Sequence, residues 1–500
     1  MKIMINILLA AFMAITLLFS PSYCLAGEDP EIKELKKIVK TLVEQNEKQQ
    51  LRIDKLSKKV DELEKRNTAG GAAPENGSQS ALDKAVAGLG NSINPDNKAS
   101  GKYSSKQPAP AAQKLIDISY DVMSTGGWAD KKNADLSALQ AGGHDAKKRG
   151  FNLNAAELSL TGAVDPNFRG ESHIVFTPGG VELEEAFLTS QKLPHNLQLK
   201  LGYFLNEFGR VNPTHPHSWQ FIDKPVIASR LFGADGFRSE GMRLSWLLPA
   251  KWYSEIYLGL QNADSETAAS FLSGKVDPED PGTYSDTGIP SGIGGRPMAY
   301  KDTRSAADLA KFIRFENSWD MGRETTAKLG FSALAGPNGT GPDARTDLYG
   351  ADLILKWRPV KNFRGWPFLI FESEYMKRKY RADGFTDIAA NNPANALAAD
   401  TLYDSGFYSQ FVYGFRPNWA AGLRYEKASG SGESIGGRQT DACRDDRTRI
   451  SPVLIHYPSE FSRIRLQYNR DRAEHLPDKK AGSVWMTYEI MYGFHPAHKF

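Results

Sequence analysis

The chain is almost free of cysteine. Only Cys24 and Cys443 occur among its 500 residues, and the first lies in an N-terminal segment that we expect to be removed. A single remaining thiol excludes a disulfide scaffold and a cysteine-ligated metal cluster. A Cys-x-x-Cys-His motif is missing too, so we expect no c-type haem on this chain.

Long apolar runs and an excess of one charge are also missing. After residue 26, no stretch approaches the roughly 20 apolar residues of a membrane-spanning helix. The 62 Lys and Arg residues nearly balance the 59 Asp and Glu residues, giving a formal net charge of +3. This balance does not indicate the excess of positive charge that nucleic-acid-binding proteins have. Hydrophobic residues make up 40%, which fits a β-barrel with a polar lumen as well as it fits a soluble protein.

Common enzyme motifs do not occur in the sequence. A Walker loop and a His-Glu-x-x-His motif are both absent. We therefore expect no enzymatic activity and no cofactor. The informative features are instead the periodic patterns along the chain.

The first 26 residues are predicted to be a signal peptide. Lys2 is followed by an apolar run over residues 3–19 and then by a small residue, Ala26, at a plausible cleavage position. These three features are typical of secreted bacterial chains, and the run is short for a retained membrane anchor. Tyr23 precedes Cys24 where a lipoprotein would have a small residue, so lipidation of Cys24 is not expected.

The end of the chain predicts a strand with one apolar face. Every second residue from Val484 to Phe494 is apolar or aromatic, and a strand turns alternate residues to one face. On the last strand of a secreted chain, lipid is the expected partner of such a face, the alternative being the final strand of a soluble β-sandwich. The ending also resembles the signal that the barrel-assembly machinery reads in outer-membrane barrels. The residues assigned to this signal are Tyr492, Phe494 and Phe500.

Sixteen strands are predicted between residues 114 and 500. Their ranges are 114–122, 150–163, 168–177, 181–192, 196–205, 236–249, 253–264, 306–320, 324–335, 346–359, 366–381, 401–416, 419–429, 447–457, 462–472 and 482–494. Short joins alternate with mostly long ones, as periplasmic turns and external loops do in outer-membrane barrels. The even number and the alternation predict an all-β transmembrane barrel of about 16 antiparallel strands over 114–500.

The predicted strands have two chemically different faces. Leu197, Leu199 and Leu201 alternate with Gln198 and Lys200, and other strands repeat the pattern. Apolar side chains on one face and charged side chains on the other indicate lipid outside and a wet interior rather than a packed core.

An N-terminal α-helical coiled coil is predicted over residues 28–66. Ile32, Val39, Asn46, Ile53 and Val60 occupy heptad position a, and Leu35, Leu42, Gln49, Leu56 and Leu63 occupy position d. β-branched residues at position a with Leu at position d favour a coiled coil of two helices. General porins, however, are usually trimers, so we favour a trimer over a dimer on the barrel architecture alone. A flexible linker of about 47 residues, 67–113, spans roughly 35–40 Å. The alternative for 28–66 is a single solvated helix.

Residues 206–235 form the third external loop of this topology. In general porins the third loop folds inward and narrows the pore, so we carry that role over as a family analogy; the alternative is an external lid. Fixed charges at a constriction select ions. The residues predicted to line the constriction and pore are Arg210, Lys224, Arg230, Arg238, Lys200, Arg243, Arg314, Glu316, Arg463 and Arg465.

Four segments of the chain resemble one bacterial family. They are 208–219 (Phe-Gly-Arg-Val-Asn-Pro-Thr-His-Pro-His-Ser-Trp), 230–237, 245–249 and the ending 494–500. These segments are similar to uncharacterised outer-membrane proteins often labelled zinc-regulated TonB-dependent outer membrane receptors, and more distantly to phosphate-selective porins. The resemblance implies an outer-membrane β-barrel and keeps a substrate-specific uptake receptor, possibly zinc-related, as an alternative to a diffusion porin.

His215-Pro-His217 is the one pattern that suggests a metal, since imidazole is a good zinc ligand. No third ligand can be identified from the sequence, and His495 and His498 fall at the opposite end of the predicted barrel. The two histidines are therefore weak candidates, and no resident metal is predicted.

These patterns together predict a homo-oligomeric porin of the bacterial outer membrane, with its coiled coil in the periplasm. Small hydrophilic solutes or ions would diffuse passively through it, with outer-membrane lipid as its surroundings and no nucleic acid as a partner. Besides the uptake receptor, a structural or sheath barrel without open conductance remains an alternative.

Overall fold

The computed structural model describes residues 116–139, 142–272, 292–296, 303–384, 397–431, 434–435, 438–439 and 444–493. The chain divides into two compact units, Met1–Ala109 and Pro110–Phe500, and all described residues belong to the second. The predicted signal peptide, coiled coil and linker lie outside the described residues, as do Phe494 and Phe500 of the predicted assembly signal.

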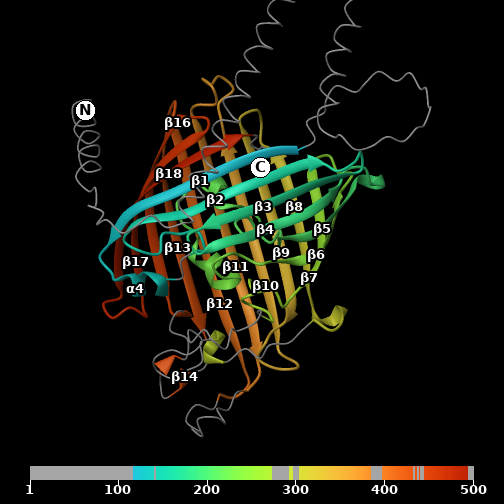
Figure 1. Cartoon of the computed structure of the whole chain (residues 1–500), viewed down its shortest axis with the longest axis vertical. Helices are drawn as coiled ribbons and strands as arrows, with labels where there is room; N and C mark the ends of the chain where they lie inside the picture. The colour runs from blue at the N-terminus through green and yellow to red at the C-terminus, as the bar shows by residue number, and fades with distance from the viewer. Residues whose placement is uncertain are drawn as a thin grey trace, which may run out of the picture. The chain divides into compact units, whose positions relative to one another are not determined.

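Among the described residues, sixteen antiparallel strands close into one barrel (Figure 1). Each strand pairs with its neighbours in sequence, and β18 returns to pair with β1. The strands are β1 (Ile116–Ala129), β2 (Gly150–Ala163), β3 (Phe168–Thr177), β4 (Gly180–Ser190), β5 (Leu197–Leu205), β6 (Arg238–Leu247), β7 (Tyr253–Asn262), β8 (Leu309–Asp320), β9 (Thr325–Pro337), β10 (Arg345–Trp357), β11 (Phe368–Ala382), β12 (Asp400–Arg416), β13 (Trp419–Ser431), β16 (Arg447–Ser459), β17 (Ser462–Ala473) and β18 (Lys480–Gly493). Closure leaves no unpaired sheet edge, which a spanning sheet requires in lipid.

Short elements lie in the connections. They are α4 (Asn133–Ala138), η1 (Pro194–Asn196), η2 (Pro216–Ser218), α5 (Val226–Phe232), η4 (Ile293–Gly295), η5 (Ala306–Asp308) and the two-stranded sheet of β14 (Ser434–Ile435) and β15 (Arg438–Gln439). None of the helices in the described ranges has the length and hydrophobicity needed to cross a bilayer.

All sixteen predicted strands are present in the barrel, with ends that differ by a few residues. The largest difference is β1, which continues to Ala129 instead of ending at residue 122. Gly126 and Gly127 interrupt the alternation of side chains there, so a strand beyond residue 122 is not predicted. Gly127 pairs with Trp485 at the closing seam, and a Cβ at Gly127 would lie 2.2 Å from the carbonyl oxygen of Val484. Close approach of two backbones therefore explains a glycine inside this strand.

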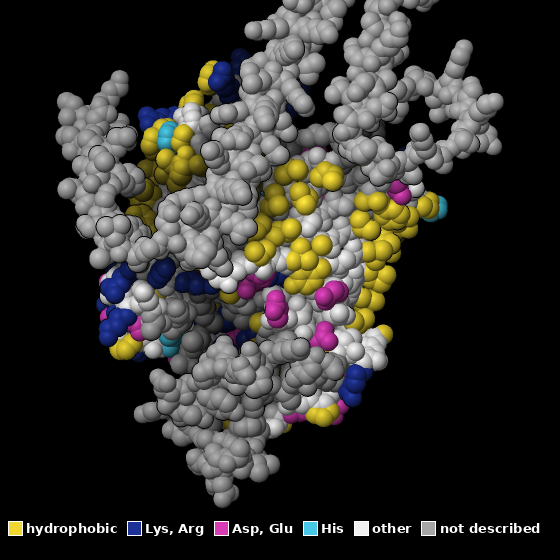
Figure 2. All heavy atoms as spheres, in the orientation of Figure 1, with side chains coloured by type: hydrophobic (Ala, Val, Ile, Leu, Met, Phe, Trp, Pro, Cys, Tyr) yellow, Lys and Arg dark blue, Asp and Glu magenta, His cyan; other side chains and the backbone are white. Residues whose placement is uncertain are grey.

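The barrel wall has an apolar outer face and a polar inner face. On β17, Leu466 and Tyr468 are 46% and 44% exposed, while Arg465 and Gln467, which alternate with them, are fully buried. Figure 2 shows hydrophobic side chains covering the wall, with charged side chains gathered nearer the end at which α4 lies. A soluble barrel would show the opposite arrangement, because its apolar residues would fill the interior.

Candidate functional site

The connection between β5 and β6, residues 206–237, lies inside the barrel; we call it the inward segment. Every residue of this segment is buried or half-buried, and its polar groups bond to strands on several sides of the lumen. Figure 1 shows it in green within the ring of strands. It contains η2 and α5.

One asparagine ties the two ends of the inward segment together. The Asn212 side-chain amide donates to the carbonyl oxygens of Asn206 (2.7 Å) and Phe237 (3.2 Å), and its oxygen accepts from the Phe237 amide (2.9 Å). Because β5 and β6 are paired neighbours, the segment leaves and re-enters the wall at adjacent points. This bridge satisfies backbone groups that would otherwise be buried without partners.

The first part of the inward segment contacts the wall opposite β5. The Gly209 amide donates to Ser332 Oγ on β9 (3.1 Å), and the Arg210 amide donates to Glu374 Oε1 on β11 (3.1 Å). Gly209 has a left-handed φ of 64°, and a Cβ there would lie 1.6 Å from the Glu374 carboxylate. Only glycine fits this approach of segment to wall.

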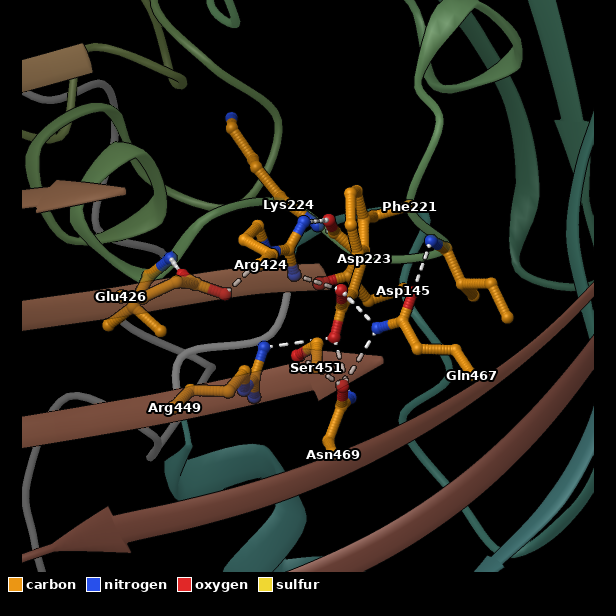
Figure 3. Close-up of polar contacts among 12 residues, drawn as sticks. Asp145, Phe221, Asp223, Lys224, Arg424, Glu426, Arg449, Ser451, Gln467 and Asn469 are labelled. Carbon is orange, nitrogen blue, oxygen red and sulfur yellow. Dashed lines mark hydrogen bonds and ion pairs between the residues drawn. The ribbon is translucent and has the colours of Figure 1, made fainter. Parts of the chain in front are cut away.

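The middle of the inward segment is held by a single carboxylate, that of Asp223 (Figure 3). It forms ion pairs with Arg424 of β13 and with Arg449 of β16, the latter at 2.9 Å. It also accepts hydrogen bonds from the amides of Gln467 (2.8 Å) and Asn469 (2.7 Å) on β17. Burial alone would raise the pKa of Asp223, but the two guanidinium groups outweigh it and lower that pKa, so the carboxylate is ionised.

Next to this carboxylate lies a buried ammonium group. Lys224 donates to the carbonyl oxygens of Gly233 and Ala234, each at 3.3 Å. Burial lowers the pKa of Lys224 to about 8, against the favourable effect of Asp235 and other carboxylates. The lysine therefore stabilises the turn after α5 from within the segment.

The wall arginines of β17 also hold the inward segment. Arg463 donates to the carbonyl oxygens of Trp219 (2.8 Å) and His217 (2.7 Å), and Arg465 donates to those of Trp219 and Phe221, both at 2.9 Å. Both guanidinium groups also pair with Glu489 of β18 at 2.7 Å. One carboxylate thus pairs with two guanidinium groups, each of which also donates to backbone carbonyl oxygens of the inward segment.

The helix α5 packs with apolar side chains and with two polar contacts. The Val226 amide donates to Glu426 of β13 (2.6 Å), and the Arg230 guanidinium donates to the carbonyl oxygens of Arg444 and Asp445, each at 3.0 Å. Around it, Phe208, Phe232, Phe271, Leu348, Met376 and further residues form a buried apolar cluster between the segment and strands of the wall. This cluster is a small core inside a largely polar lumen.

Nine of the ten residues predicted to line the pore are buried in contacts, and Arg210 is half-buried. The buried ones are Lys224, Arg230, Arg238, Lys200, Arg243, Arg314, Glu316, Arg463 and Arg465. Lys200 and Arg243 meet at Glu207 of the inward segment (2.7 and 2.8 Å), whereas Arg314 pairs with Glu316 (2.8 Å) and Asp352 (2.6 Å) within the wall. Tyr492, the described residue of the predicted assembly signal, is 77% exposed on β18.

The two candidate metal residues lie in a cluster of histidine and glutamate side chains. His215 bonds to Glu184 (2.9 Å) and Glu185 (2.8 Å) of β4, and His217 lies 3.2 Å from Glu157 of β2. A β-bulge explains why two consecutive glutamates face the lumen, because the β3–β4 register shifts at this point. Burial alone would lower the pKa of His215, but these carboxylates outweigh it and raise that pKa.

Two small cavities lie between the inward segment and the nearby wall. One of about 20 Å³ lies beside His144, Glu184 and His215, and one of about 30 Å³ lies beside Asp223 and Arg449. Each has room for a water molecule or two, since a water needs roughly 10–15 Å³ by this measure. The segment is therefore packed against these strands rather than suspended in the lumen.

Several residues of the site could not be found by sequence reasoning. The inward position of both Glu184 and Glu185 depends on a bulge, which the alternating pattern does not reveal. Glu207 falls in a loop, and the sequence does not show whether that loop points into the barrel or out of it. The sequence does indicate that Gln467 and Asn469 face the lumen, because both fall on the predicted polar face of their strand. Pairing those polar positions with the one acidic residue in the middle of the loop could have suggested the contact.

The fold defines a sixteen-stranded antiparallel β-barrel whose β5–β6 connection lies inside it. No protein-family model matches the sequence. A protein of Aquifex aeolicus (strain VF5), described as "Uncharacterized protein", is 30% identical over 425 residues, which cover 79% of this chain and 82% of that protein. The chain belongs to the same family as this Aquifex protein.

Solved structures with a similar arrangement of strands include three outer-membrane proteins. The outer membrane channel DcaP of Acinetobacter baumannii is 12% identical with a TM-score of 0.48, over 75% of this chain and 97% of that chain. The anion-selective porin from Comamonas acidovorans is 8% identical with a TM-score of 0.45. OmpT of Vibrio cholerae, in its trimer form, is 9% identical with a TM-score of 0.44, and both comparisons cover 75% of this chain and 99% of the other. These values are too low to carry an inference about activity.

Proposed function

We propose that the chain is a porin of the bacterial outer membrane through which small hydrophilic solutes or ions diffuse passively. The observation that carries this proposal is the closed barrel with an apolar outer face and a charged inner face. Lipid is the natural partner of the outer face, and water is the natural partner of a polar lumen. Residues 206–235 act as the constriction in this proposal.

In this proposal, solutes reach the inner wall of β7 to β11 at its short-turn end. At the short-turn end of these strands, the inner face carries partly buried charged side chains of both signs: Glu255, Lys328, Lys356 and Glu372, together with Arg210 of the segment. Arg210 and Glu372 lie 3.8 Å apart. Because both signs of charge are present, we expect weak ion selectivity rather than strong anion selectivity.

The same proposal includes the parts of the chain outside the described residues. Residues 1–26 direct export, residues 67–113 link the barrel to residues 28–66, and a coiled coil of residues 28–66 holds protomers together in the periplasm. A trimer is proposed over a dimer, because the barrel face offers a larger contact than the stalk. Phe494 and Phe500 complete the signal for barrel assembly.

The test is single-channel recording of the purified, refolded full chain in planar bilayers. We expect discrete open steps of small conductance with weak selectivity from the reversal potential, and closure in groups of three for a trimer. Heat-dependent mobility on a denaturing gel verifies that the barrel is folded. Folded, inserted protein that passes no current would overturn the porin proposal and support a structural or sheath barrel.

A substrate-specific uptake receptor is the second candidate, and the cluster of histidine and glutamate side chains favours it. Such a cluster on the inner wall could recognise a zinc-related solute during transport. Uptake into proteoliposomes would then saturate with solute concentration and fall when His215 and His217 are replaced together by alanine. Linear uptake with no effect of this double variant would contradict the receptor and leave passive diffusion.

A further inference from the structure

Three side chains from three separate elements converge inside the barrel with the geometry of a metal site. Glu157 of β2, His173 of β3 and His215 of the inward segment each offer one ligand atom, and these atoms lie within 4.8 Å of one another. His173 Nδ1 lies 3.0 Å from Glu157 Oε1, and His215 Nδ1 lies 3.5 Å from Glu157 Oε2. Bonds of about 2.0–2.2 Å in a tetrahedral arrangement put neighbouring donor atoms roughly 3.3–3.5 Å apart.

The cluster is buried and contains three carboxylate groups. Glu157 is 3%, His173 8% and His215 9% exposed, and Glu184 and Glu185 beside them are similarly buried. Ionised carboxylates away from water need positive partners. His144 and Arg238 lie 2.7 and 3.6 Å from Glu184, and a divalent cation would supply further positive charge at Glu157.

The surrounding side chains are those expected around metal-bound imidazole and carboxylate. His215 contacts Glu185 through Nε2 at 2.8 Å, leaving Nδ1 on the side of Glu157 and Glu184. Ser159 Oγ donates to Glu157 Oε1 at 2.8 Å. A carboxylate that accepts from the far nitrogen of a ligating histidine fixes its tautomer and orientation. His217 lies beside this group, 3.2 Å from Glu157.

We propose that Glu157, His173 and His215 bind one divalent transition-metal ion inside the barrel, with His217 beside them. A set of two imidazoles and one carboxylate belongs to ions such as Zn²⁺ and Co²⁺ rather than to Ca²⁺ or Mg²⁺, which prefer oxygen donors alone. The ion joins the inward segment to β2 and β3, on the side of the lumen away from β9 and β11. This site needs no passage of solute, so it is independent of the porin proposal.

The experiment is titration of the folded, metal-stripped full chain in detergent with Co²⁺ and then with Zn²⁺. We expect one Co²⁺ per chain, with visible absorption bands of a low-coordinate site that disappear when Zn²⁺ displaces it. His173→Ala and Glu157→Gln should weaken binding at least about 100-fold, since outer partners alone are worth about 10–100-fold. Glu185→Gln should weaken it less, within that range.

Two controls separate this site from other histidines and from misfolding. His195→Asn changes an exposed histidine in the turn before β5, and His495→Ala with His498→Ala changes the C-terminal pair; both variants should bind as the parent does. Heat-dependent gel mobility verifies that each variant is folded. No binding by the folded parent overturns the proposal, and so does binding that survives His173→Ala and Glu157→Gln.

Discussion

At the scale of single residues, Asp223 has more partners in the wall than any other side chain described above. Its two oxygens serve two arginines and two amides from three strands. The pairs are buried, so their net contribution to stability is small while the cost of removing one partner is large. Asp223 therefore determines where the inward segment lies more than how stable the barrel is.

Replacing Asp223 by alanine should release the middle of the inward segment. Two buried guanidinium groups would lose their carboxylate, at a cost of about 3–5 kcal/mol, and the segment can reduce that cost by detaching from the wall so that water reaches these groups. We expect a larger and noisier single-channel conductance with an unchanged barrel. Planar-bilayer recordings of Asp223→Ala measure this.

The matched control for Asp223→Ala is Asp320→Ala, an exposed carboxylate at the end of β8. It should conduct as the parent does. If Asp223→Ala also shows the parental conductance and noise, the segment is held by its other contacts and this account of Asp223 is wrong.

At the scale of elements, the strands were predictable because each obeys a local rule. Alternation with period two, and turns between the runs, are properties of ten to fifteen neighbouring residues. Where that rule failed, in residues 123–129 of β1, two glycines served the closing seam. The pairing of β1 with β18 joins residues that are distant in sequence, and no local pattern could specify its register.

The register of the closing seam can be tested with a cysteine pair. Thr125 of β1 and Thr487 of β18 are direct partners whose hydroxyl oxygens lie 2.7 Å apart on the inner face. Directly opposed side chains have Cβ atoms about 4.5–5.5 Å apart, within small adjustment of a disulfide. In a background of Cys24→Ser and Cys443→Ser, Thr125→Cys with Thr487→Cys should form an intramolecular disulfide on mild oxidation.

The loss of free thiol in the folded protein, measured with a maleimide reagent, reports this disulfide. Thr125→Cys with Ser483→Cys is the control, since Ser483 pairs with Ala129 and not with Thr125. Equal reactivity of the two pairs would show that the register at the seam differs from that described.

The inward segment was the least predictable element. The prediction that it lies inside the barrel rests on a family analogy and not on its own residues. A loop rich in polar and aromatic side chains has no regular alternation from which its position could be predicted. The contacts that hold it, such as Gly209 against Glu374 and Asp223 against Arg424, join positions that are distant in sequence. His215 likewise meets Glu157 and His173 only once β2, β3 and the segment come together.

At the scale of the whole molecule, the outer face of the barrel is an apolar band with charged ends. On β17 the outward side chains change from Leu466 and Tyr468 to Arg470 and Arg472 along the strand. This change marks the edge of the band, where lipid tails give way to headgroups and water. The proposed place in the outer membrane rests on that band.

A charge placed in the middle of the band should therefore impair insertion. Leu466→Arg is expected to cost about 2–4 kcal/mol in the bilayer, against about 0–1 kcal/mol for Ser462→Arg near the end of the same strand. The measurement is the folded fraction in lipid vesicles, read from heat-dependent gel mobility across a urea series. Equal folded fractions for the two variants would argue against lipid contact at Leu466.

The sequence by itself determined the number of strands, their order and which face of each is apolar, because these follow from alternation and turn chemistry within short stretches of chain. Only the tertiary structure decided where residues 206–237 lie, how the wall charges are paired and which side chains meet His215. Of the charges predicted to line a pore, Arg243 pairs with Glu207 of the inward segment and Arg463 pairs with Glu489 of the neighbouring strand. The physical reason is that ion pairs and metal ligands depend on distances of a few ångströms between residues far apart in sequence, which closure of the barrel sets.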